Sequence, residues 1–477
     1  MICRAIACWI CTLGLLAAGP GCGQGRAAPQ GNSRASNAGS NAAQVRASER
    51  LAARPATPLE PGQSWPGWRG PGGQGVAGKT QLPETWPEEA PSPFWRAALG
   101  TGWSSPVVAG GRVVITDRQD GTERTLAFDA ETGELVWERT HPVDFDPHEV
   151  GARHGNGPKS TPLVRDDRVY CLGIAGWLEC LDLKDGSVIW QVNLPAQFGA
   201  RQALRGGRAY VNGTENVIVP VGEGQGAPVP LFGYTGSPTF VDDLLVCSVG
   251  GASGGTIMAF HAKTGEVAWK SLRENVSYSS PIVAEVAGKR QIVVMTGPHV
   301  VGLDPADGRP LWKHPFQIQY DESIGTPVAH GEFVLFTATS RPLTALRISR
   351  EGDGWRKQVA WENLELTSYL SSMLIHEGHV YGMNDGGEFA CVRLADGKTV
   401  WVEGHHGYYC TPVLAGSRLL CLNERGQLLL VAASPEGYRE LGQSKLTDGP
   451  TWTSPAVVGS RLYIRSDKEL RAFDFGR

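Results

Sequence analysis

The sequence lacks the motifs that mark a nucleotide-dependent enzyme or a serine hydrolase. It contains no P-loop, no dinucleotide fingerprint that opens a helix and no G-x-S-x-G nucleophile elbow. The glycine cluster at Gly250–Gly255 falls in a connection between strand-like runs instead. A net charge of −4 over 477 residues leaves no basic excess, so we expect no nucleic-acid partner.

Cysteines are also missing from the arrangements that redox or metal chemistry uses. Of ten cysteines, three lie before residue 12 and Cys22 follows the apolar N-terminal stretch. We expect the rest to be small buried side chains, with Cys171 and Cys180 best placed for a hairpin disulfide in an exported protein. All six lie in strand-like runs without CxxC, CxxCH or an adjacent pair: Cys171, Cys180, Cys247, Cys391, Cys410 and Cys421.

No hydrophobic run is long enough for a membrane-spanning helix. The first 22 residues carry Arg4 and then an apolar stretch at 5–19, which predicts a signal peptide. Cys22 is the candidate lipid anchor, although Gly19 stands where a lipoprotein signal usually carries leucine. Residues 23–63 are poor in bulky apolar side chains, which predicts a disordered leader before one domain at 64–477.

These features together predict an exported protein. We expect it in the periplasm, or as a lipoprotein of the outer membrane or cell surface, contacting the membrane only through an anchor at Cys22.

One unit recurs along the chain and dominates its organisation. It reads AFDAETGELVW at 127–137, and its C-terminal copy is cut to the front half, RAFDFGR. The upstream strand PFWRAAL at 93–99 supplies the missing half, so the strand around Trp95 should close a ring. The other copies lie at 180–190, 259–269, 302–312 and 391–401, with a stretched copy at 345–361 and a worn copy, which ends in leucine, at 431–441.

A second pattern gives the same count of eight. Each unit is preceded by a hydroxyl residue that is followed by proline in all but one case and then by a β-rich run. These starts are Ser105, Thr161, Ser237, Ser280, Thr326, Thr411 and Ser454 before proline, and Ser372 before methionine.

Each repeat has the signature of a four-stranded antiparallel blade. Short β-branched runs are separated by glycine turns, and one small twisted sheet cannot bury both of its faces alone. The sequence therefore predicts an all-β, eight-bladed propeller. Tryptophans at one fixed place in the last strand should pack between blades as structural residues: Trp95, Trp137, Trp190, Trp269, Trp312, Trp361 and Trp401.

These units, the hydroxyl-proline starts and the opening WPGWRGPGGQGVA at 65–77 resemble the pyrroloquinoline quinone (PQQ)-repeat β-propeller proteins, especially exported members from planctomycete-type bacteria. The resemblance covers residues 65–477 and implies the fold. It leaves two activities open. Quinoprotein alcohol and glucose dehydrogenases bind PQQ and calcium on the propeller axis, whereas the propeller lipoprotein of the outer-membrane assembly machine has no cofactor.

A ligand site should lie where the connections into the first strands line an axial funnel. Aromatic side chains recur there with charged groups between them, as in a concave pocket for a planar or sugar-like ligand. The alternative is that these side chains only plug the channel. The candidates are Trp103, His154, Asn156, Lys159, Tyr234, Tyr278, Glu322, Tyr369, Tyr408 and Trp452.

One of these connections, at 141–155, groups acidic and histidine side chains. Its spacing fits neither a calcium loop nor HExxH, so we expect a solvated loop and no metal. The groups concerned are Asp144, Asp146, His148, Glu149 and His154.

We therefore expect a monomeric, non-catalytic propeller that binds a protein or carbohydrate partner at the cell envelope and needs no cofactor. The alternatives are a PQQ-dependent oxidoreductase and an outer-membrane protein assembly factor. The adjacent-cysteine disulfide that many quinoprotein dehydrogenases place against PQQ is missing, and so is a haem domain.

Overall fold

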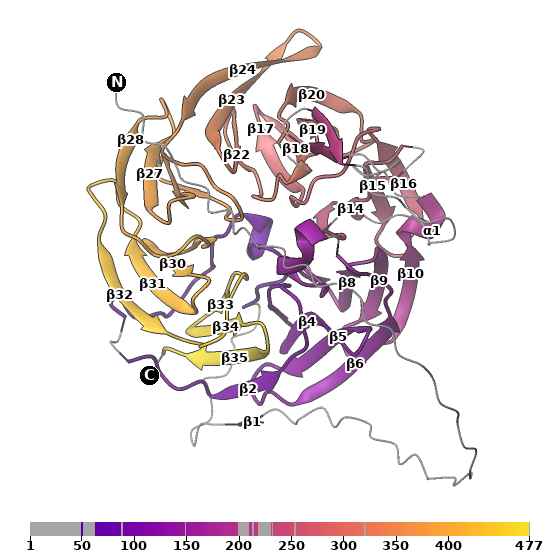
Figure 1. The fold of residues 1–477 in the computed structure, drawn as a ribbon, viewed down its shortest axis with the longest axis vertical. Coiled ribbons are helices and arrows are strands. Elements are labelled where there is room, and N and C mark those ends of the chain that lie inside the picture. The colour runs from indigo at the N-terminus through magenta and orange to yellow at the C-terminus, as the bar shows by residue number, and fades with distance from the viewer. Residues whose placement is uncertain are drawn as a thin grey trace, which may run out of the picture. The chain divides into compact units, whose positions relative to one another are not determined.

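The chain forms a ring of eight antiparallel β-sheets, each built from four strands that follow one another outward from the axis (Figure 1). This arrangement, seen in a computed structural model, confirms the predicted eight-bladed propeller. The structure describes residues 49–50, 63–86, 89–147, 149–198, 209–211, 214–217, 230, 232–251, 254–318 and 321–476.

The first four blades each run from an inner strand of three to five residues to an outer edge strand. Blade 1 holds β3 (Val107–Ala109), β4 (Arg112–Gln119), β5 (Thr122–Asp129) and β6 (Leu135–Pro142); blade 2 holds β7 (Leu163–Arg165), β8 (Arg168–Leu172), β9 (Trp177–Asp182) and β10 (Val188–Asn193); blade 3 holds β13 (Thr239–Val241), β14 (Leu244–Ser248), β15 (Ile257–His261) and β16 (Val267–Ser271); blade 4 holds β17 (Ile282–Val286), β18 (Lys289–Met295), β19 (His299–Leu303) and β20 (Pro310–Pro315).

The remaining blades repeat this order, and blade 5 extends its outer hairpin beyond the others. Blade 5 holds β21 (Val328–His330), β22 (Phe333–Ala338), β23 (Arg341–Glu351) and β24 (Gly354–Asn363); blade 6 holds β25 (Leu374–His376), β26 (His379–Met383), β27 (Phe389–Arg393) and β28 (Thr399–Glu403); blade 7 holds β29 (Val413–Ala415), β30 (Arg418–Leu422), β31 (Gln427–Ala432) and β32 (Glu440–Lys445); blade 8 holds β33 (Ala456–Val458), β34 (Arg461–Arg465), β35 (Glu469–Asp474) and β2 (Trp95–Ala98), with β1 (Glu49–Arg50) beside β2.

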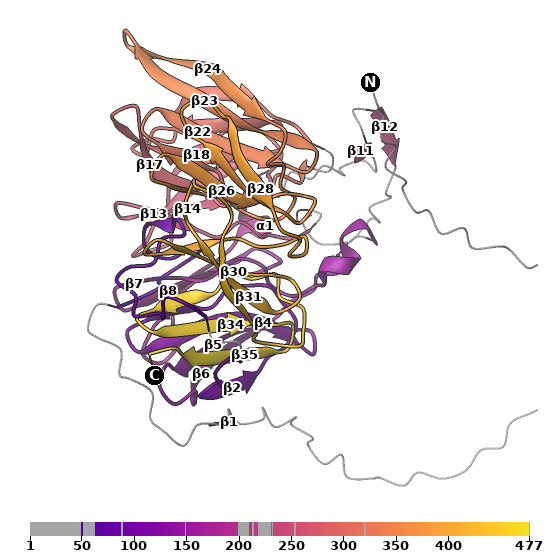
Figure 2. The same cartoon turned by 90° about the vertical axis from the view of Figure 1, so that its left-hand side faces the viewer.

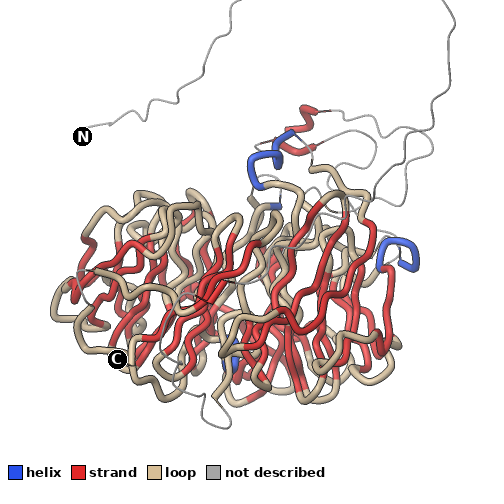
Figure 3. Tube along the Cα trace, turned by 90° about the horizontal axis from the view of Figure 1, so that it is seen from below, coloured by secondary structure: helices blue, strands red, loops and turns tan. Residues whose placement is uncertain are grey.

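Short elements outside the blades mark the two faces of the ring. The top face carries the 3-10 helix η2 (Glu149–His154), while the helix α1 (Leu194–Phe198) lies at the outer rim beside β10 (Figure 1); β11 (Ala209–Val211) and β12 (Thr214–Val217) form a separate hairpin. The bottom face carries the 3-10 turn η1 (Pro71–Gly73) (Figures 2 and 3). Among the described residues, no helix is long and apolar enough to cross a membrane.

The ring is closed by a strand from the opposite end of the chain. β2 pairs with β35 in antiparallel register, Trp95 opposite Ala472 and Ala98 opposite Glu469. Blade 8 therefore consists of three C-terminal strands and one N-terminal strand, which lie side by side in Figure 1. This confirms the closure predicted from the split eighth repeat.

The repeated tryptophans join neighbouring blades. In six cases the indole Nε1 donates to a main-chain oxygen in the next blade, as from Trp190 to Ala262 at 2.8 Å. In five of these cases the indole ring also covers the glycine of the next blade's turn; a Cβ on Gly265, for example, would lie 2.7 Å from Trp190. Trp312 differs and donates to Gln291 of its own blade at 2.7 Å.

The hydroxyl residues at the blade starts form a second ring, around the axis. Ser105 N–H donates to Thr161 Oγ1 at 3.0 Å, and Thr161 N–H donates to Ser237 Oγ at 2.9 Å. The same link recurs from Ser237 to Ser280, Thr326 to Ser372, Ser372 to Thr411 and Ser454 to Ser105. These side chains are buried, so the repeated hydroxyl satisfies a main-chain donor of the preceding blade.

The worn seventh repeat is completed by another N-terminal residue. Blade 7 has Leu441 where other blades have tryptophan, and Trp86 packs there. The main-chain N–H of Trp86 donates to Leu441 O at 3.2 Å, and the centroid of its ring lies 4.0 Å from that of Phe475 in blade 8. An upstream tryptophan thus fills the gap between blades 7 and 8.

The expectation of a hairpin disulfide between Cys171 and Cys180 is wrong. Both cysteines are free and buried. In the β8–β9 pairing, Cys171 lies opposite Glu179 and Cys180 lies opposite Tyr170. Opposed residues share a face of the sheet and adjacent residues do not, so the two thiols point to opposite faces.

Candidate functional site

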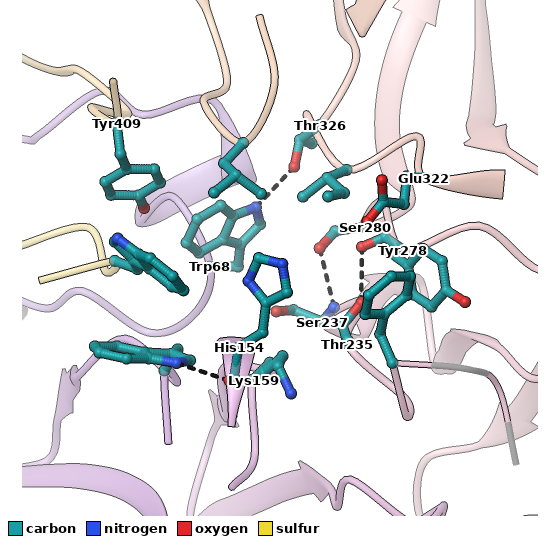
Figure 4. Close-up of a pocket in the computed structure, with 15 residues that line it drawn as sticks. Trp68, His154, Lys159, Thr235, Ser237, Tyr278, Ser280, Glu322, Thr326 and Tyr409 are labelled. Atoms are coloured by element: carbon teal, nitrogen blue, oxygen red, sulfur yellow. Dashed lines mark hydrogen bonds between the residues drawn. The ribbon is translucent and has the colours of Figure 1, made fainter. Parts of the chain in front are cut away.

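A cavity of about 130 Å³ lies on the propeller axis, above the ring of hydroxyls (Figure 4). Its walls come from the connections into the first strands of several blades, together with one residue from the N-terminal segment. It is lined by Trp68, Trp103, His154, Lys159, Phe232, Thr235, Ser237, Tyr278, Ser280, Glu322, Ile324, Thr326, Leu370, Tyr409 and Trp452.

Aromatic rings in mutual contact form most of the wall. The ring centroids of Trp103 and Trp452 are 5.0 Å apart, and His154 lies 5.3 Å from Trp452. On the other side, Phe232 meets Tyr278 edge to face at 4.9 Å. Such tilted and edge-on pairs are favourable arrangements of aromatic side chains, so they hold the wall in shape without a ligand.

The floor is Trp68, from the segment before the first blade. Its Nε1 donates to Thr326 Oγ1 at 2.9 Å, which ties the indole to the hydroxyl ring (Figure 4). The next residue, Arg69, is fully buried and donates to the main-chain oxygens of Gln74 at 3.1 Å and Met373 at 2.5 Å. The N-terminal segment therefore closes the axial channel from below.

His154 is held as a neutral imidazole. Burial, and then the nearby charges of Arg153 and Lys159, lower its pKa to about 4. Arg153 Nε lies 3.1 Å from His154 Nε2, and the backbone oxygen of His154 accepts from Trp103 Nε1 at 3.0 Å. An imidazole with this pKa is uncharged near pH 7, so His154 lines the cavity as a neutral ring and not as a cation.

The lining residues include two groups whose ordinary form is charged, and burial disfavours the charge on both. Lys159 donates to Gly155 O at 3.1 Å, and burial lowers its pKa to about 8 even though Glu123 acts in the opposite direction. Burial raises the pKa of Glu322, while Arg153 counteracts the shift. The lining is mainly aromatic and apolar, with Lys159 and Glu322 as its two ordinarily charged groups.

The structure brings six of the ten predicted funnel residues to the cavity: Trp103, His154, Lys159, Tyr278, Glu322 and Trp452. The other four lie elsewhere. Tyr234 is 2% exposed and packs in the core of blades 2 and 3, and Tyr408 is 48% exposed at the surface. Asn156 contacts Thr101, while Tyr369 accepts a hydrogen bond from Arg153 at 2.6 Å outside the lining.

Several lining residues were not among the predicted candidates. Trp68 stands in the sequence motif at 65–77, but its contact with Thr326 spans 258 positions, which no local pattern reveals. Tyr409 and Leu370 line the cavity in place of their neighbours Tyr408 and Tyr369. The sequence pattern places Ser237, Ser280 and Thr326 only at the blade starts. The regular repetition of these hydroxyls is the signal that could have identified them as lining residues.

The described lining offers few charged groups to PQQ or calcium. Calcium takes about six to eight oxygen ligands and favours carboxylates, whereas Glu322 is the one carboxylate in the lining. PQQ carries several carboxylates, and Lys159 is the one lining residue with a basic amino group. Over the described ranges, no group of three or more His, Cys, Asp or Glu side chains could hold a metal ion; His148 of the 141–155 loop lies outside them.

The fold and the site together define an eight-bladed PQQ-type β-propeller with an aromatic axial pocket. The family described as "Outer membrane protein assembly factor BamB" matches residues 89–176 and 160–403, more than half of the chain. The chain therefore belongs to this family.

Individual proteins match this chain at low sequence identity. The BamB of Burkholderia pseudomallei is 23% identical over 70% of this chain and 85% of its own length. Tetrathionate hydrolase of Acidithiobacillus ferrooxidans is 22% identical over 46% of each protein.

Solved structures show the same fold with different functions. BamB from Moraxella catarrhalis covers 80% of this chain and 98% of its own, with a TM-score of 0.51 and 13% identity. Quinohemoprotein alcohol dehydrogenase from Comamonas testosteroni covers 88% of this chain and 81% of its own, with a TM-score of 0.56 and 13% identity. These likenesses define the fold and leave the activity to be argued from the site.

Proposed function

We propose that this chain is an exported, non-catalytic binding protein of the cell envelope that receives an apolar or aromatic group of a protein partner in its axial pocket. The observation that carries the proposal is the aromatic wall that Trp103, Trp452, His154, Phe232 and Tyr278 form around the cavity. Pockets of this kind bind through apolar contact and orient the ligand through a few polar groups, here Lys159 and Glu322.

The hydroxyls in the lining support binding over catalysis. A nucleophilic hydroxyl needs a base within hydrogen-bond reach. Ser237 and Ser280 accept main-chain N–H groups of the ring, and Thr326 accepts Trp68 Nε1. Among the serine and threonine hydroxyls of the described lining, none hydrogen-bonds to a histidine or a carboxylate, so these hydroxyls are not activated as nucleophiles.

Membership of the BamB family supports a protein partner, since the family description and three of the matching relatives name an outer membrane protein assembly factor. A role in outer-membrane protein assembly is therefore part of the proposal, with export through residues 1–22 and an anchor at Cys22. Those residues lie outside the described ranges. The proposal assigns no role to PQQ, because the donor set does not suit it.

The test is complementation of a strain of the native host that lacks this protein. We expect the amounts of folded outer-membrane β-barrels, measured by their altered mobility on unheated gels, to fall in the deletion strain and to recover with the wild-type gene. Trp452→Ala, in the pocket wall, should fail to restore them. Trp355→Ala, on the blade 5 hairpin outside the pocket, is the matched control and should restore them.

Two results would contradict the proposal. One is full complementation by Trp452→Ala. The other is an unchanged outer-membrane protein profile in the deletion strain, which would remove the assembly role. Binding of a purified oligosaccharide, lost in Trp452→Ala, would replace the protein partner by a glycan.

A further inference from the structure

The inner edges of four blades are covered by the N-terminal segment 65–81, on the bottom face. Trp65 exchanges two main-chain hydrogen bonds with Val108 of β3, at 2.7 and 2.8 Å. Pro66 O accepts from Val164 N–H of β7 at 2.7 Å, and Gly75 O accepts from Leu414 N–H of β29 at 2.7 Å. Near the end of the segment, Gln81 N–H donates to Gly459 O after β33 at 3.0 Å.

The equivalent edges of blades 3 to 6 have no such cover. The comparison uses the residue three positions after the hydroxyl that starts each blade. In the four covered blades these residues are at most 4% exposed: Val108, Val164, Leu414 and Val457. Their counterparts Phe240, Val283, Ala329 and Ile375 are only half-buried. Within the part of the chain that the structure describes, these four residues make no main-chain hydrogen bond outside their own blades.

Two cavities follow these uncovered edges. One, of about 330 Å³, runs beneath blades 2 to 4 and is lined by Phe240, Ile282 and Val283 together with the glycines of the 70–73 turn. The other, of about 40 Å³, continues beneath blades 4 to 6 along Ala329 and Ile375. Trp68 lines the larger cavity as well as the axial pocket, so one indole separates the two sites.

We propose that the inner edges of β13, β17, β21 and β25 form a docking site for an extended peptide segment of a partner protein. The chain's own segment shows how such a peptide would bind. Its successive residues Trp65 and Pro66 bond to successive blades, so a bound chain makes one or two main-chain bonds per blade and runs round the channel. A partner peptide would continue this existing interface across the other half of the ring.

The chemistry of the site defines the occupant. Free N–H and C=O groups at a strand edge pair with an extended backbone, and pockets beside them select side chains. The exposed side chains here are apolar, and the glycine turn leaves room beside them. The occupant is therefore an extended peptide rich in small or β-branched residues. The site is distinct from the axial pocket and does not depend on the function proposed for that pocket.

The experiment uses the full chain and a fluorescein-labelled peptide of alternating valine and threonine with lysines at both ends. We expect saturable binding by fluorescence anisotropy. Ile282→Glu should weaken it at least tenfold, because it puts a charge beside the edge. Val359→Glu, on the outer strand β24, is the matched control and should bind as the wild type does, as should the axial-pocket variant Trp452→Ala.

A photo-crosslinking side chain gives an independent readout if Ile282→Glu fails to fold. Placed at Ala329 it should crosslink to the peptide, and placed at Val359 it should not. No saturable binding by the wild type, equal binding by folded Ile282→Glu, or crosslinking at Val359 as strong as at Ala329 would each overturn the docking site. Weaker binding by Trp452→Ala alone would place the peptide in the axial pocket instead.

Discussion

At the scale of single residues, five of the inter-blade tryptophans perform two structural tasks. Trp190 is largely buried between blades 2 and 3, and its Nε1 satisfies the Ala262 carbonyl oxygen. It also packs on Gly265, whose φ of 75° and lack of a Cβ allow the indole to approach. The tryptophan of one repeat thus packs directly on the glycine of the next repeat.

Replacing this contact should cost stability. We expect Trp190→Ala to lower the free energy of unfolding by about 3–5 kcal/mol, because it leaves a cavity and removes the shortest hydrogen bond to the Ala262 carbonyl oxygen, which Tyr170 also contacts at 3.3 Å. Trp355→Ala, on the blade 5 hairpin, should cost about 1 kcal/mol or less. Urea unfolding followed by circular dichroism measures both, and equal losses would contradict the structural role assigned to the repeat tryptophan.

Glu123 predicts a pH dependence of stability. It is 2% exposed, it accepts Ile174 N–H at 3.2 Å, and burial raises its pKa from 4.5 to about 8. Between those values the unfolded chain ionises this carboxyl while the folded chain keeps it protonated. The contribution of Glu123 to the free energy of unfolding is therefore fully present below pH 4.5 and falls as pH rises to 8.

Glu123→Gln removes this titration and also removes the charge that raises the pKa of Lys159. The stability of the wild type relative to the variant should fall by on the order of 2 kcal/mol between about pH 6 and pH 8, since each pH unit in the window is worth up to about 1.4 kcal/mol. Urea unfolding of both proteins at the two pH values measures it. A constant difference would show that Glu123 ionises in the folded protein.

At the scale of elements, the N-terminal strands hold the ring together. β2 supplies the outer strand of blade 8, Trp86 fills the slot beside Leu441, and segment 65–81 covers the inner edges of four blades. A chain that starts at residue 100 would expose the β35 edge and lose all three contacts.

Such a truncation should lower the melting temperature by on the order of 10 °C or more and promote aggregation through the free edge. A chain that starts at residue 63 keeps every one of these contacts and is the control. Thermal melts and size-exclusion chromatography compare the two. Identical melts would show that the N-terminal strand does not close the ring in solution.

The blades and their closure could be predicted from the sequence because both depend on local repeats. Each repeat carries a glycine turn and, in most copies, a tryptophan in its last strand at fixed places. The split eighth copy shows which two segments of the chain must meet. The lining of the pocket could be predicted only in part, because it depends on contacts between distant segments. Trp68 reaches the axis from before blade 1, and the choice of Tyr409 over Tyr408 depends on the orientation of one loop.

At the scale of the whole molecule, the same propeller serves both assembly factors and quinoprotein dehydrogenases among its structural relatives. The content of the axial cavity is therefore the basis for the function proposed for this chain. We propose that its aromatic rings, its neutral His154 and Glu322, the one carboxylate of the described lining, receive an apolar group of a partner and not a charged quinone with calcium.

The most direct test of this account is a thermal melt of residues 63–477 with and without PQQ and calcium. A ligand that binds only the native state raises the melting temperature by mass action. The account predicts no saturable shift, even at concentrations well above micromolar. A saturable increase that is lost in Glu322→Gln would show that the axial pocket holds the cofactor, and would contradict the assignment of this propeller as a binding protein.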